Sequence, residues 1–370
     1  MKYYIIAGEA SGDLHGANLM KALYIEDPNA DIRFWGGDLM SSVGGTLVKH
    51  YRDLAFMGFI EVIFHLKTIL NNIKVAKSDI VAFNPDVLIF IDYPGFNLRI
   101  AKWAKPLGYK THYYISPQIW AWKENRIKDI KQDVDKMYVI LPFEKEFYET
   151  KHLYPVDFVG HPLIDAIHNQ TPIASDQFRK ENQLSNKPIV AILPGSRKQE
   201  ITKMLSVMLS VVNDFPDYQF VIAGAPSQEY SFYEGFITNE NIKFVSNKTY
   251  DLLRSSTAAI VTSGTATLET ALFKVPEIVC YKGSWASYQI AKRIITLKYI
   301  SLVNLIMDEE VVKELIQEKC TKKHIHEELY KLLDPEYRKI LLEKYNALEE
   351  KLGGIGASQK TAKLIVADLK

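Results

Sequence analysis

The chain alternates short apolar runs with longer segments in which apolar residues recur at helical spacing. In the first half, the runs that predict strands, each followed by a turn and a helix, are Tyr3–Ala7, Ile32–Trp35, Val87–Asp92, Lys110–Ile115 and Lys136–Ile140. Strands that alternate with helices predict a parallel sheet covered by helices on both faces. The run that ends at Asp92 is apolar throughout, which is typical of a strand buried on both faces.

A polar stretch with X-Pro pairs interrupts this pattern between Val159 and Pro188, and we interpret it as a domain boundary. A second series of predicted strands follows, near Ile189–Leu193, Gln219–Ala223, Ile242–Val245, Ala258–Thr262 and Glu277–Tyr281. We therefore expect an α/β protein with two Rossmann-like domains, residues 1–165 and 166–353, whose parallel sheets face each other across a cleft.

The segment from Glu309 to Lys370 is charged and helical in period, and Gly353-Gly354 interrupts it. The last helix, about 354–370, is expected to return to the first domain or to a partner subunit.

Composition narrows the class of protein. A length of 370 residues and an apolar fraction of 47% suffice for two cores. With 45 basic and 44 acidic residues the net charge is +1, so a nucleic-acid partner is not expected. Cys280 and Cys320 form no disulfide or zinc pattern, which favours a reducing, intracellular compartment. The first apolar run is too short for a signal peptide, and no run reaches the roughly 18 residues of a spanning helix, so any membrane contact should be peripheral.

Two turns of the second domain combine glycine with hydroxyl groups between a strand and a helix. The first is Leu193–Arg197, before a helix predicted over Lys198–Asp214. Backbone N–H groups at the helix start, the Ser196 hydroxyl and the Arg197 guanidinium are suited to bind a phosphate. The alternative is an ordinary turn with Arg197 in a surface ion pair.

The second turn lies in the stretch Thr262–Glu269, which contains Ser263, Gly264, Thr265 and Ala266, and its helix carries Glu269 about one turn in. A carboxylate cannot bind phosphate, but it can accept two hydrogen bonds from the vicinal diol of a ribose. A diphosphate site beside a diol site indicates a nucleotide sugar. The alternative role for Glu269 is a capping-box acid of its own helix.

The first domain offers a carboxylate at a strand end and a glycine-containing loop. Asp92 is placed for chemistry because ligands of α/β sheets gather beyond the carboxyl ends of the strands, although it could instead cap the next helix or begin a turn. The loop Gly8–Gly12 precedes a helix that Ser11 or Asp13 is expected to cap and that runs to about Tyr24. The loop lacks the G-x-G-x-x-G spacing of dinucleotide sites and suits an anion or a sugar.

Motifs in one order along nearly the whole chain resemble those of the lipid-A-disaccharide synthase family. They are Gly8–Asp13 (GEASGD), Asp92–Asn97 (DYPGFN), Tyr114–Trp122 (YISPQIWAW), Leu141–Glu144 (LPFE), Gly160–Leu163 (GHPL), Leu193–Arg197 (LPGSR), Ser263–Glu269 (SGTATLE) and Ser301–Asn304 (SLVN).

The resemblance implies a GT-B fold and an inverting, metal-independent glycosyltransferase without a cofactor. Its donor would be UDP-2,3-diacylglucosamine and its acceptor 2,3-diacylglucosamine 1-phosphate. The products would be UDP and the β-1,6-linked disaccharide 1-phosphate of lipid A biosynthesis. The resemblance also suggests a homodimer through the C-terminal region.

Carried over by position, the resemblance makes Asp92 the catalytic base and Arg197 an essential residue on the diphosphate side. Glu269, Asn304 and Gln317 become nucleotide-sugar contacts. The sequence differs from the family at Lys313, where a proline often precedes the pair equivalent to Glu314-Leu315.

Candidates for the acceptor side or the cleft are Glu9, Ser11, Asp13 and His15, although a histidine in the position of His15 more often packs. Trp120 and Trp122 are either core aromatics or platforms for the acceptor sugar. Asp133-Val134-Asp135 matches the D-x-D of metal-dependent glycosyltransferases but precedes a predicted strand, so we predict no metal site.

The segment Phe56–Ile73 carries apolar residues at helical spacing, including Ile63, Leu66 and Leu70. One interpretation is a core-facing helix. The other, which an acylated substrate favours, is a surface that docks on the membrane with help from nearby lysines. The expected location is the cytoplasm, peripheral on the inner face of the cytoplasmic membrane.

The sequence is also compatible with two other functions. One is another GT-B enzyme, such as a peptidoglycan N-acetylglucosaminyltransferase or a UDP-sugar epimerase. The other is a nucleotide-sugar-binding protein without catalytic activity.

Overall fold

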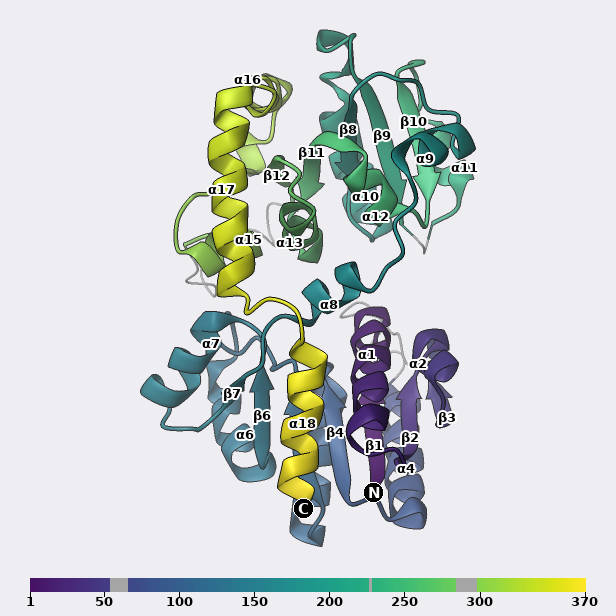
Figure 1. Cartoon of the computed structure of the whole chain (residues 1–370), viewed down its shortest axis with the longest axis vertical. Helices are drawn as coiled ribbons and strands as arrows, with labels where there is room; N and C mark the ends of the chain where they lie inside the picture. The colour runs from purple at the N-terminus through teal and green to yellow at the C-terminus, as the bar shows by residue number, and fades with distance from the viewer. Residues whose placement is uncertain (54–65, 226–227, 284–297) are drawn as a thin grey trace. The chain divides into compact units, whose positions relative to one another are not determined.

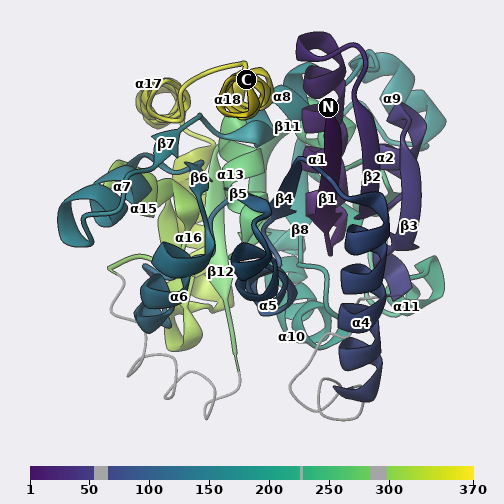
Figure 2. The ribbon, with the colours of Figure 1, turned by 90° about the horizontal axis from the view of Figure 1, so that it is seen from below.

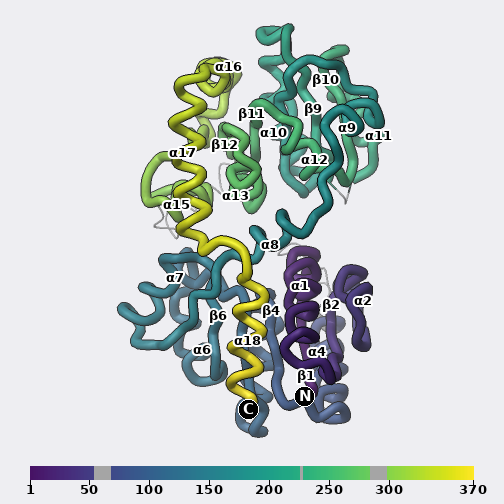
Figure 3. Tube along the Cα trace, in the orientation of Figure 1, coloured from purple at the N-terminus to yellow at the C-terminus, as the bar shows by residue number. Residues whose placement is uncertain are grey.

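The structure is a computed structural model, and it describes residues 1–53, 66–225, 228–283 and 298–370. The chain forms two compact units (Figure 1). Unit 1 is Met1–Asn169 together with Leu352–Lys370, and unit 2 is Gln170–Lys351. Figure 3 follows the chain out of unit 1 after α8 and back before α18. The sequence placed these boundaries at 165/166 and 353/354.

Unit 1 contains a sheet of seven parallel strands within the described residues, in the order β3-β2-β1-β4-β5-β6-β7. These strands are β1 (Lys2–Ala7), β2 (Asp31–Gly36), β3 (Thr46–His50), β4 (Val87–Ile91), β5 (Lys110–Tyr114), β6 (Lys136–Val139) and β7 (Asp157–Phe158). Every residue of β4 is buried, as the apolar run before Asp92 predicts. The chain crosses from one side of β1 to the other between β3 and β4, which makes the edge beyond β1 and β4 a topological switch point.

Helices cover both faces of this sheet. They are α1 (Ala10–Glu26), α2 (Asp38–Val43), α4 (Leu66–Phe83), α5 (Pro94–Ala104), α6 (Ile127–Asp133), α7 (Pro142–Glu146), α8 (Pro162–His168) and α18 (Ala357–Leu369), with shorter turns at Tyr51–Asp53, Lys105–Leu107, Glu124–Arg126 and Phe147–Lys151. In Figure 2, α4, α5 and α6 lie on one side of the strands, and α1 and α18 lie on the other. Side chains of the α4–α6 layer and the strands, such as Phe90, Ile100 and Ile130, share one buried core.

The C-terminal helix α18 packs on α1 and α8 of the same chain (Figure 1). Asp165 of α8 accepts hydrogen bonds from the backbone N–H groups of Gly356 (2.6 Å) and Ser358 (2.9 Å). These bonds satisfy two of the backbone donors that the start of a helix leaves without partners. Within the single chain this helix therefore belongs to unit 1, and its exchange with a partner subunit stays a prediction.

Unit 2 repeats the architecture with parallel strands in the order β10-β9-β8-β11-β12-β13. Its elements are β8 (Ile189–Leu193), β9 (Gln219–Gly224), β10 (Ile242–Ser246), β11 (Ser256–Thr262), β12 (Glu277–Tyr281) and β13 (Lys313–Ile316), with helices α9 (Ser175–Glu181), α10 (Lys198–Leu209), α11 (Tyr230–Glu234), α12 (Thr249–Arg254), α13 (Thr265–Leu272), α15 (Leu302–Met307), α16 (Lys322–Leu332) and α17 (Pro335–Lys351), and shorter turns at Val212–Asp214 and Gln317–Lys319. Its core joins alternate residues of β8, β9 and β11 to Leu252 and Leu253 of α12.

Several predicted elements need correction. The segment after Glu309 is not helical throughout, because β13 adds a strand next to β12. Because this strand contains the charged residues Lys313 and Glu314, the pattern of apolar runs did not predict it. The helix α1 begins at Ala10 and has Glu9 at its N-cap position without a side-chain cap, so neither Ser11 nor Asp13 caps it. The helix predicted to reach Asp214 ends at Leu209.

The predicted membrane-docking segment lies partly outside the described residues. This holds for Ile63 and for the side chain of Leu66. Farther along α4, Ile73, Ala76 and Ile80 are buried in the core, whereas Leu70 is 54% exposed. Among the described residues, no helix is long and apolar enough to cross a membrane.

Candidate active site

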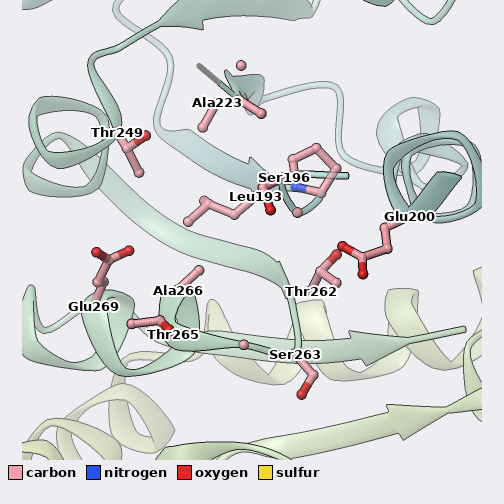
Figure 4. A pocket seen from close by; sticks show the side chains of 15 residues that line it. Leu193, Ser196, Glu200, Ala223, Thr249, Thr262, Ser263, Thr265, Ala266 and Glu269 are labelled. Carbon is pink, nitrogen blue, oxygen red and sulfur yellow. The ribbon is translucent and has the colours of Figure 1, made fainter. Parts of the chain in front are cut away.

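Unit 2 holds a cavity of about 300 Å³ at the carboxyl ends of β8, β9 and β11 (Figure 4). Its wall includes every residue of the two predicted turns except Arg197. The predicted residues that line it are Ser196, Ser263, Gly264, Thr265, Ala266 and Glu269. The helices α10 and α13 begin at this cavity, so their unpaired backbone N–H groups lie beside it. Such helix starts favour an anion.

The turn after β8 is built around Gly195, whose φ of 99° lies in the left-handed region that favours glycine. This turn exposes the Ser196 side chain at the start of α10. Arg197 is the N-cap residue of α10, and its side chain is 68% exposed. Its guanidinium lies 3.4 Å from the carboxylate of Glu200, which itself lines the cavity. The surface ion pair considered as the alternative for Arg197 is thus present.

Glu269 lies on α13 and faces the cavity from the side opposite Glu200 in Figure 4. Its Oε1 accepts a hydrogen bond of 3.0 Å from the hydroxyl of Tyr250, a residue of α12. Burial raises the pKa of the Glu269 carboxyl, and the bond from Tyr250 opposes that rise. The bond to Tyr250 is tertiary, which differs from the capping-box pairing considered for this acid.

Asn304 and Glu314 form a hydrogen-bonded group behind the cavity. The amide of fully buried Asn304 donates to the Glu314 carboxylate (2.9 Å) and to the Val312 carbonyl, and its oxygen accepts from two backbone N–H groups. The Glu314 carboxylate also accepts from the backbone N–H groups of Ile300 and Ser301. Ser263 connects this group to the cavity, because its hydroxyl donates to the Ile300 carbonyl at 3.0 Å.

Neither Asn304 nor Gln317 lines the cavity. All four hydrogen bonds of the Asn304 side chain are made within the protein, so this side chain stabilises the surrounding backbone. Gln317 is 8% exposed, and its Nε2 is buried without a hydrogen-bond partner among the described residues. Direct contact of either side chain with a nucleotide sugar stays a prediction.

In unit 1, Asp92 follows β4 at the switch point of the sheet. Asp92 (φ 44°) and Tyr93 (φ 50°) both adopt the left-handed conformation that non-glycine residues rarely occupy. The backbone carbonyl of Asp92 accepts hydrogen bonds from the hydroxyl of Tyr113 (2.5 Å) and the amide of Asn97 (2.7 Å). These two bonds hold the peptide through its carbonyl oxygen, and the carboxylate itself accepts from the backbone N–H of Tyr93. The helix-cap role does not apply to Asp92, because Tyr93 is the N-cap residue of α5.

The carboxyl of Asp92 has a pKa raised to about 6. Burial is the larger cause, and the negative charge of nearby Glu9 adds to it. A carboxylate with this pKa is still ionised at neutral pH but holds a proton more strongly than an ordinary aspartate. This is the property that general-base catalysis requires.

The other predicted residues of the first loop separate into two groups. Glu9 and Ser11 are exposed at the start of α1. Asp13 is 3% exposed, and its carboxylate accepts from the backbone N–H groups of Gly37, Leu39 and Met40, so it holds the turn into α2. His15 is buried, and burial lowers its pKa to about 4. Asp13 thus holds neighbouring backbone, and His15 is buried with its Nδ1 lacking a hydrogen-bond partner among the described residues, while contact of either residue with the acceptor stays a prediction.

The loop that carries Trp120 and Trp122 is fixed by a buried carboxylate. Glu144 is 1% exposed and accepts hydrogen bonds from the Ser116 hydroxyl (2.6 Å) and the Trp120 indole (3.1 Å). Trp120 also packs edge to face on Phe143, whereas Trp122 is 47% exposed. Trp120 therefore stabilises the loop, whereas Trp122 is exposed to solvent.

Two polar cavity residues, Glu200 and Thr249, were not predicted from the sequence, whereas Thr262 begins the predicted stretch Thr262–Glu269. The Thr262 hydroxyl is buried and has no hydrogen-bond partner among the described residues. As the last residue of β11, Thr262 lies at the edge of the sheet where the sequence predicts a ligand site. In the described part of the chain no group of three or more His, Cys, Asp or Glu side chains is arranged to hold a metal ion.

Solved structures share the fold of this chain. A UDP-N-acetylglucosamine 2-epimerase from Listeria monocytogenes, itself a provisional assignment, aligns with a TM-score of 0.69 and 14% identity over 99% of this chain and 96% of its own. A glycotransferase of kitacinnamycin aligns with a TM-score of 0.68 and 11% identity over 100% and 99%. The predicted GT-B fold, with two Rossmann-like α/β domains, is confirmed.

The family follows from sequence similarity. The sequence profile described as lipid-A-disaccharide synthetase matches residues 3–365. A lipid-A-disaccharide synthase from Trichlorobacter lovleyi is 38% identical over 98% of this chain and 96% of its own length. Another, from Syntrophus aciditrophicus, is 38% identical over 99% and 97%. The chain belongs to the lipid-A-disaccharide synthetase family and is a glycosyltransferase with a GT-B fold, which confirms the resemblance found in the sequence.

Proposed function

We propose that the protein transfers 2,3-diacylglucosamine from UDP-2,3-diacylglucosamine to the 6-hydroxyl of 2,3-diacylglucosamine 1-phosphate, with inversion and without a metal. The observation that carries the reaction is the carboxylate of Asp92 at the carboxyl end of β4, with a pKa of about 6. The family membership supplies the two substrates. The cavity in unit 2 supplies groups suited to the nucleotide.

Asp92 acts as the general base. An uncharged sugar hydroxyl is a weak nucleophile, and a carboxylate within hydrogen-bond reach takes its proton as the bond to the anomeric carbon forms. The anomeric carbon develops oxocarbenium character while its bond to the diphosphate oxygen breaks. A single displacement of this kind inverts the configuration, because the hydroxyl enters on the face opposite the leaving UDP.

The unit 2 cavity binds UDP and stabilises its departure. Backbone N–H groups at the starts of α10 and α13 lie beside the position proposed for the diphosphate, in a cavity that Ser196, Ser263 and Thr265 also line. Arg197 exchanges its exposed pair with Glu200 for the phosphate, since a guanidinium binds a diphosphate more strongly than one carboxylate in water. Glu269 accepts from the ribose diol.

The decisive experiment is measurement of UDP release with and without the lipid-linked acceptor, in excess EDTA after dialysis. UDP release only with acceptor, together with disaccharide formation, is the expected result. Release without any acceptor would indicate hydrolysis or epimerase-type chemistry. UDP-sugar binding without release would indicate a binding protein. Loss of activity in EDTA that Mg²⁺ or Mn²⁺ restores would contradict metal independence.

We also propose that the protein works at the inner face of the cytoplasmic membrane as a peripheral protein, because both substrates carry acyl chains. Exposed Leu70 of α4, with exposed Lys74 one turn later, supports a docking surface there. Dimerisation through the C-terminal region remains a proposal from the family. Sedimentation with anionic liposomes tests the first proposal, and light scattering in detergent tests the second.

A further inference from the structure

A second cavity, also of about 300 Å³, lies in unit 1 between α5 and α6. Three of its lining residues are cations, namely Arg99 and Lys102 from α5 and Arg126 from the turn before α6. None of the three forms an ion pair with a residue that the structure describes. Arg99 and Lys102 are exposed and Lys102 lies within electrostatic range of Asp133, so water and this carboxylate weaken the repulsion among the cations. Three cations without a close ion-pair partner around one cavity still favour a bound anion.

The cavity begins beside the proposed catalytic base. Pro94 and Gly95 line it and directly follow Asp92 and Tyr93 in the chain. Because a chain spans at most about 3.6 Å per residue, the Cα atoms of Asp92 and Gly95 are within about 11 Å of each other.

A second connection between the cavity and Asp92 runs through Tyr113. Its hydroxyl donates to the Asp92 carbonyl. Burial raises the pKa of the Tyr113 phenol well above its usual value, Asp92 adds to the rise, and the positive charge of Arg126 opposes it. Arg126 therefore lies within electrostatic range of the residue that holds the Asp92 peptide.

The cavity also contains an acceptor. Asp133 is 2% exposed, and one of its carboxylate oxygens is buried without a hydrogen-bond partner among the described residues. Asp129 lines the cavity too and is exposed, as Arg99 and Lys102 are, so water screens the charges of all three. The best ligand thus combines an anion for the three cations with a neighbouring N–H or O–H donor for Asp133.

We propose that this cavity binds the phosphate group of the sugar acceptor through Arg99, Lys102 and Arg126. The proposal rests on the proposed function, which makes the acceptor a sugar 1-phosphate. A phosphate monoester carries a charge of about −1.5 to −2 at neutral pH and three acceptor oxygens, which match two guanidinium groups and an ammonium. In an acylated glucosamine 1-phosphate, the amide N–H on the adjacent ring carbon is a donor suited to Asp133.

Such a site would orient the acceptor. With the phosphate at one end of the sugar fixed between α5 and α6, the hydroxyl at the other end has a restricted position relative to Asp92. Positioning a reacting group in this way is a large source of rate enhancement. The cations of this cavity would therefore decide which acceptors are used, although they take no part in the proton transfer.

The test compares two acceptors in detergent micelles without phospholipid: the sugar 1-phosphate and the same acylated sugar without its phosphate. We expect the wild type to prefer the phosphorylated acceptor. Arg99→Ala and Arg126→Ala should each lower kcat/KM for it by about 10- to 100-fold, the loss expected for a charge-assisted hydrogen bond. For the unphosphorylated acceptor, kcat/KM should change by less than about threefold, because the lost bond is absent from that complex. Arg99→Lys should retain part of the preference.

The control is Lys128→Ala, which removes an exposed lysine of α6 that does not line the cavity. It should leave the ratio of the two kcat/KM values unchanged. Thermal unfolding and UDP affinity, a property of unit 2, check that each variant is folded.

The outcomes separate this proposal from the proposed function. If the wild type uses both acceptors equally, or if the arginine variants lose both activities in parallel, the phosphate site is wrong while the transferase reaction stands. If the variants keep the acceptor preference but lose binding to phospholipid vesicles, the cavity binds membrane phosphate and the proposal is also wrong. If neither acceptor yields a disaccharide with the wild type, the proposed function itself fails.

Discussion

The two units place opposite chemistry at equivalent positions of the same topology. Their sheets share one strand order, β3-β2-β1-β4-β5-β6 in unit 1 and β10-β9-β8-β11-β12-β13 in unit 2. The loops after the first and fourth strands of unit 1 carry Glu9 and Asp92. The corresponding loops of unit 2 carry Ser196 and Ser263. The two loops of unit 1 therefore carry carboxylates, whereas those of unit 2 carry hydroxyls, and the acids of the unit 2 cavity, Glu200 and Glu269, lie farther along the following helices.

This difference shows what the fold decides and what the side chains decide. The fold directs both loops to the carboxyl edge of a sheet, where ligands of α/β proteins bind. In unit 1 burial, with a smaller contribution from the single neighbouring carboxylate of Glu9, raises the pKa of Asp92, which suits it to act as a base. In unit 2 the same edge has no carboxylate directly after β8 or β11, so donors dominate and an anion is favoured. The following predictions test this division, from the largest expected effect to the smallest.

Asp92→Asn should abolish most of the turnover, by about 10²- to 10⁴-fold, because an amide cannot accept the proton of the attacking hydroxyl. UDP affinity should stay near that of the wild type, since the nucleotide cavity belongs to unit 2. Initial rates of disaccharide formation and calorimetric titration with UDP measure the two quantities. Turnover within a few-fold of wild type would remove Asp92 from the mechanism.

Arg197→Ala should lower kcat/KM by about 10- to 100-fold, the value of a charge-assisted hydrogen bond to the leaving diphosphate. Lys203→Ala is a matched control, because it removes an exposed cation from the same helix. The measurement is steady-state kinetics with the donor varied. If both variants behaved alike, Arg197 would be only the exposed partner of Glu200 that the structure shows.

Glu269→Ala should weaken UDP binding by about tenfold or more, and Tyr250→Phe by a smaller factor of about two- to tenfold. Tyr250 donates to Glu269 and so holds the carboxylate in place. Titrations with UDP and with 2′-deoxy-UDP separate the causes. Because the deoxy ligand lacks one ribose hydroxyl, both substitutions should cost less affinity for it. Equal losses for the two ligands would contradict the diol contact.

The smallest expected effect is a shift in the pH dependence of kcat/KM when Glu9 is replaced. Asp92 must be ionised to act, so activity should fall as the pH drops through its pKa of about 6. Glu9→Gln removes the like charge that raises this pKa, so the acidic limb should move to lower pH. Burial, the larger cause, persists, so the limb should stay above the ordinary aspartate value. A limb that moved upward, or did not move, would exclude Glu9 as a cause.

Much of this architecture could be predicted from the sequence, because the signals are local. Apolar runs such as Ile189–Leu193 and Glu277–Tyr281 coincide with β8 and β12, since a strand buried on both faces needs continuous apolar residues. The turns after β8 and β11 were identified from glycine and hydroxyl residues between a strand and a helix. The charged strand β13 was missed, because its edge position relaxes that requirement.

The motifs of the family also came from the sequence, but their physical roles did not. Asp13 and Asn304 belong to conspicuous motifs, and in the structure their side chains hold neighbouring backbone segments. Glu144, likewise, joins two motifs that lie more than twenty residues apart by accepting from Ser116 and Trp120. A motif identifies candidate residues. Only their contacts in the structure distinguish a residue that stabilises the fold from one that is placed to bind a ligand.

The sequence by itself determined the two-domain α/β organisation, the glycine-and-hydroxyl turns and the acid at the end of the fourth strand of unit 1. Only the tertiary structure decided the proton affinity of Asp92, the partner of Glu269 and the three cations between α5 and α6. The physical reason is that each of these properties depends on groups brought together from distant parts of the chain. Glu9 approaches Asp92, and Arg126 approaches the helix that carries Arg99, because the sheet places their loops side by side.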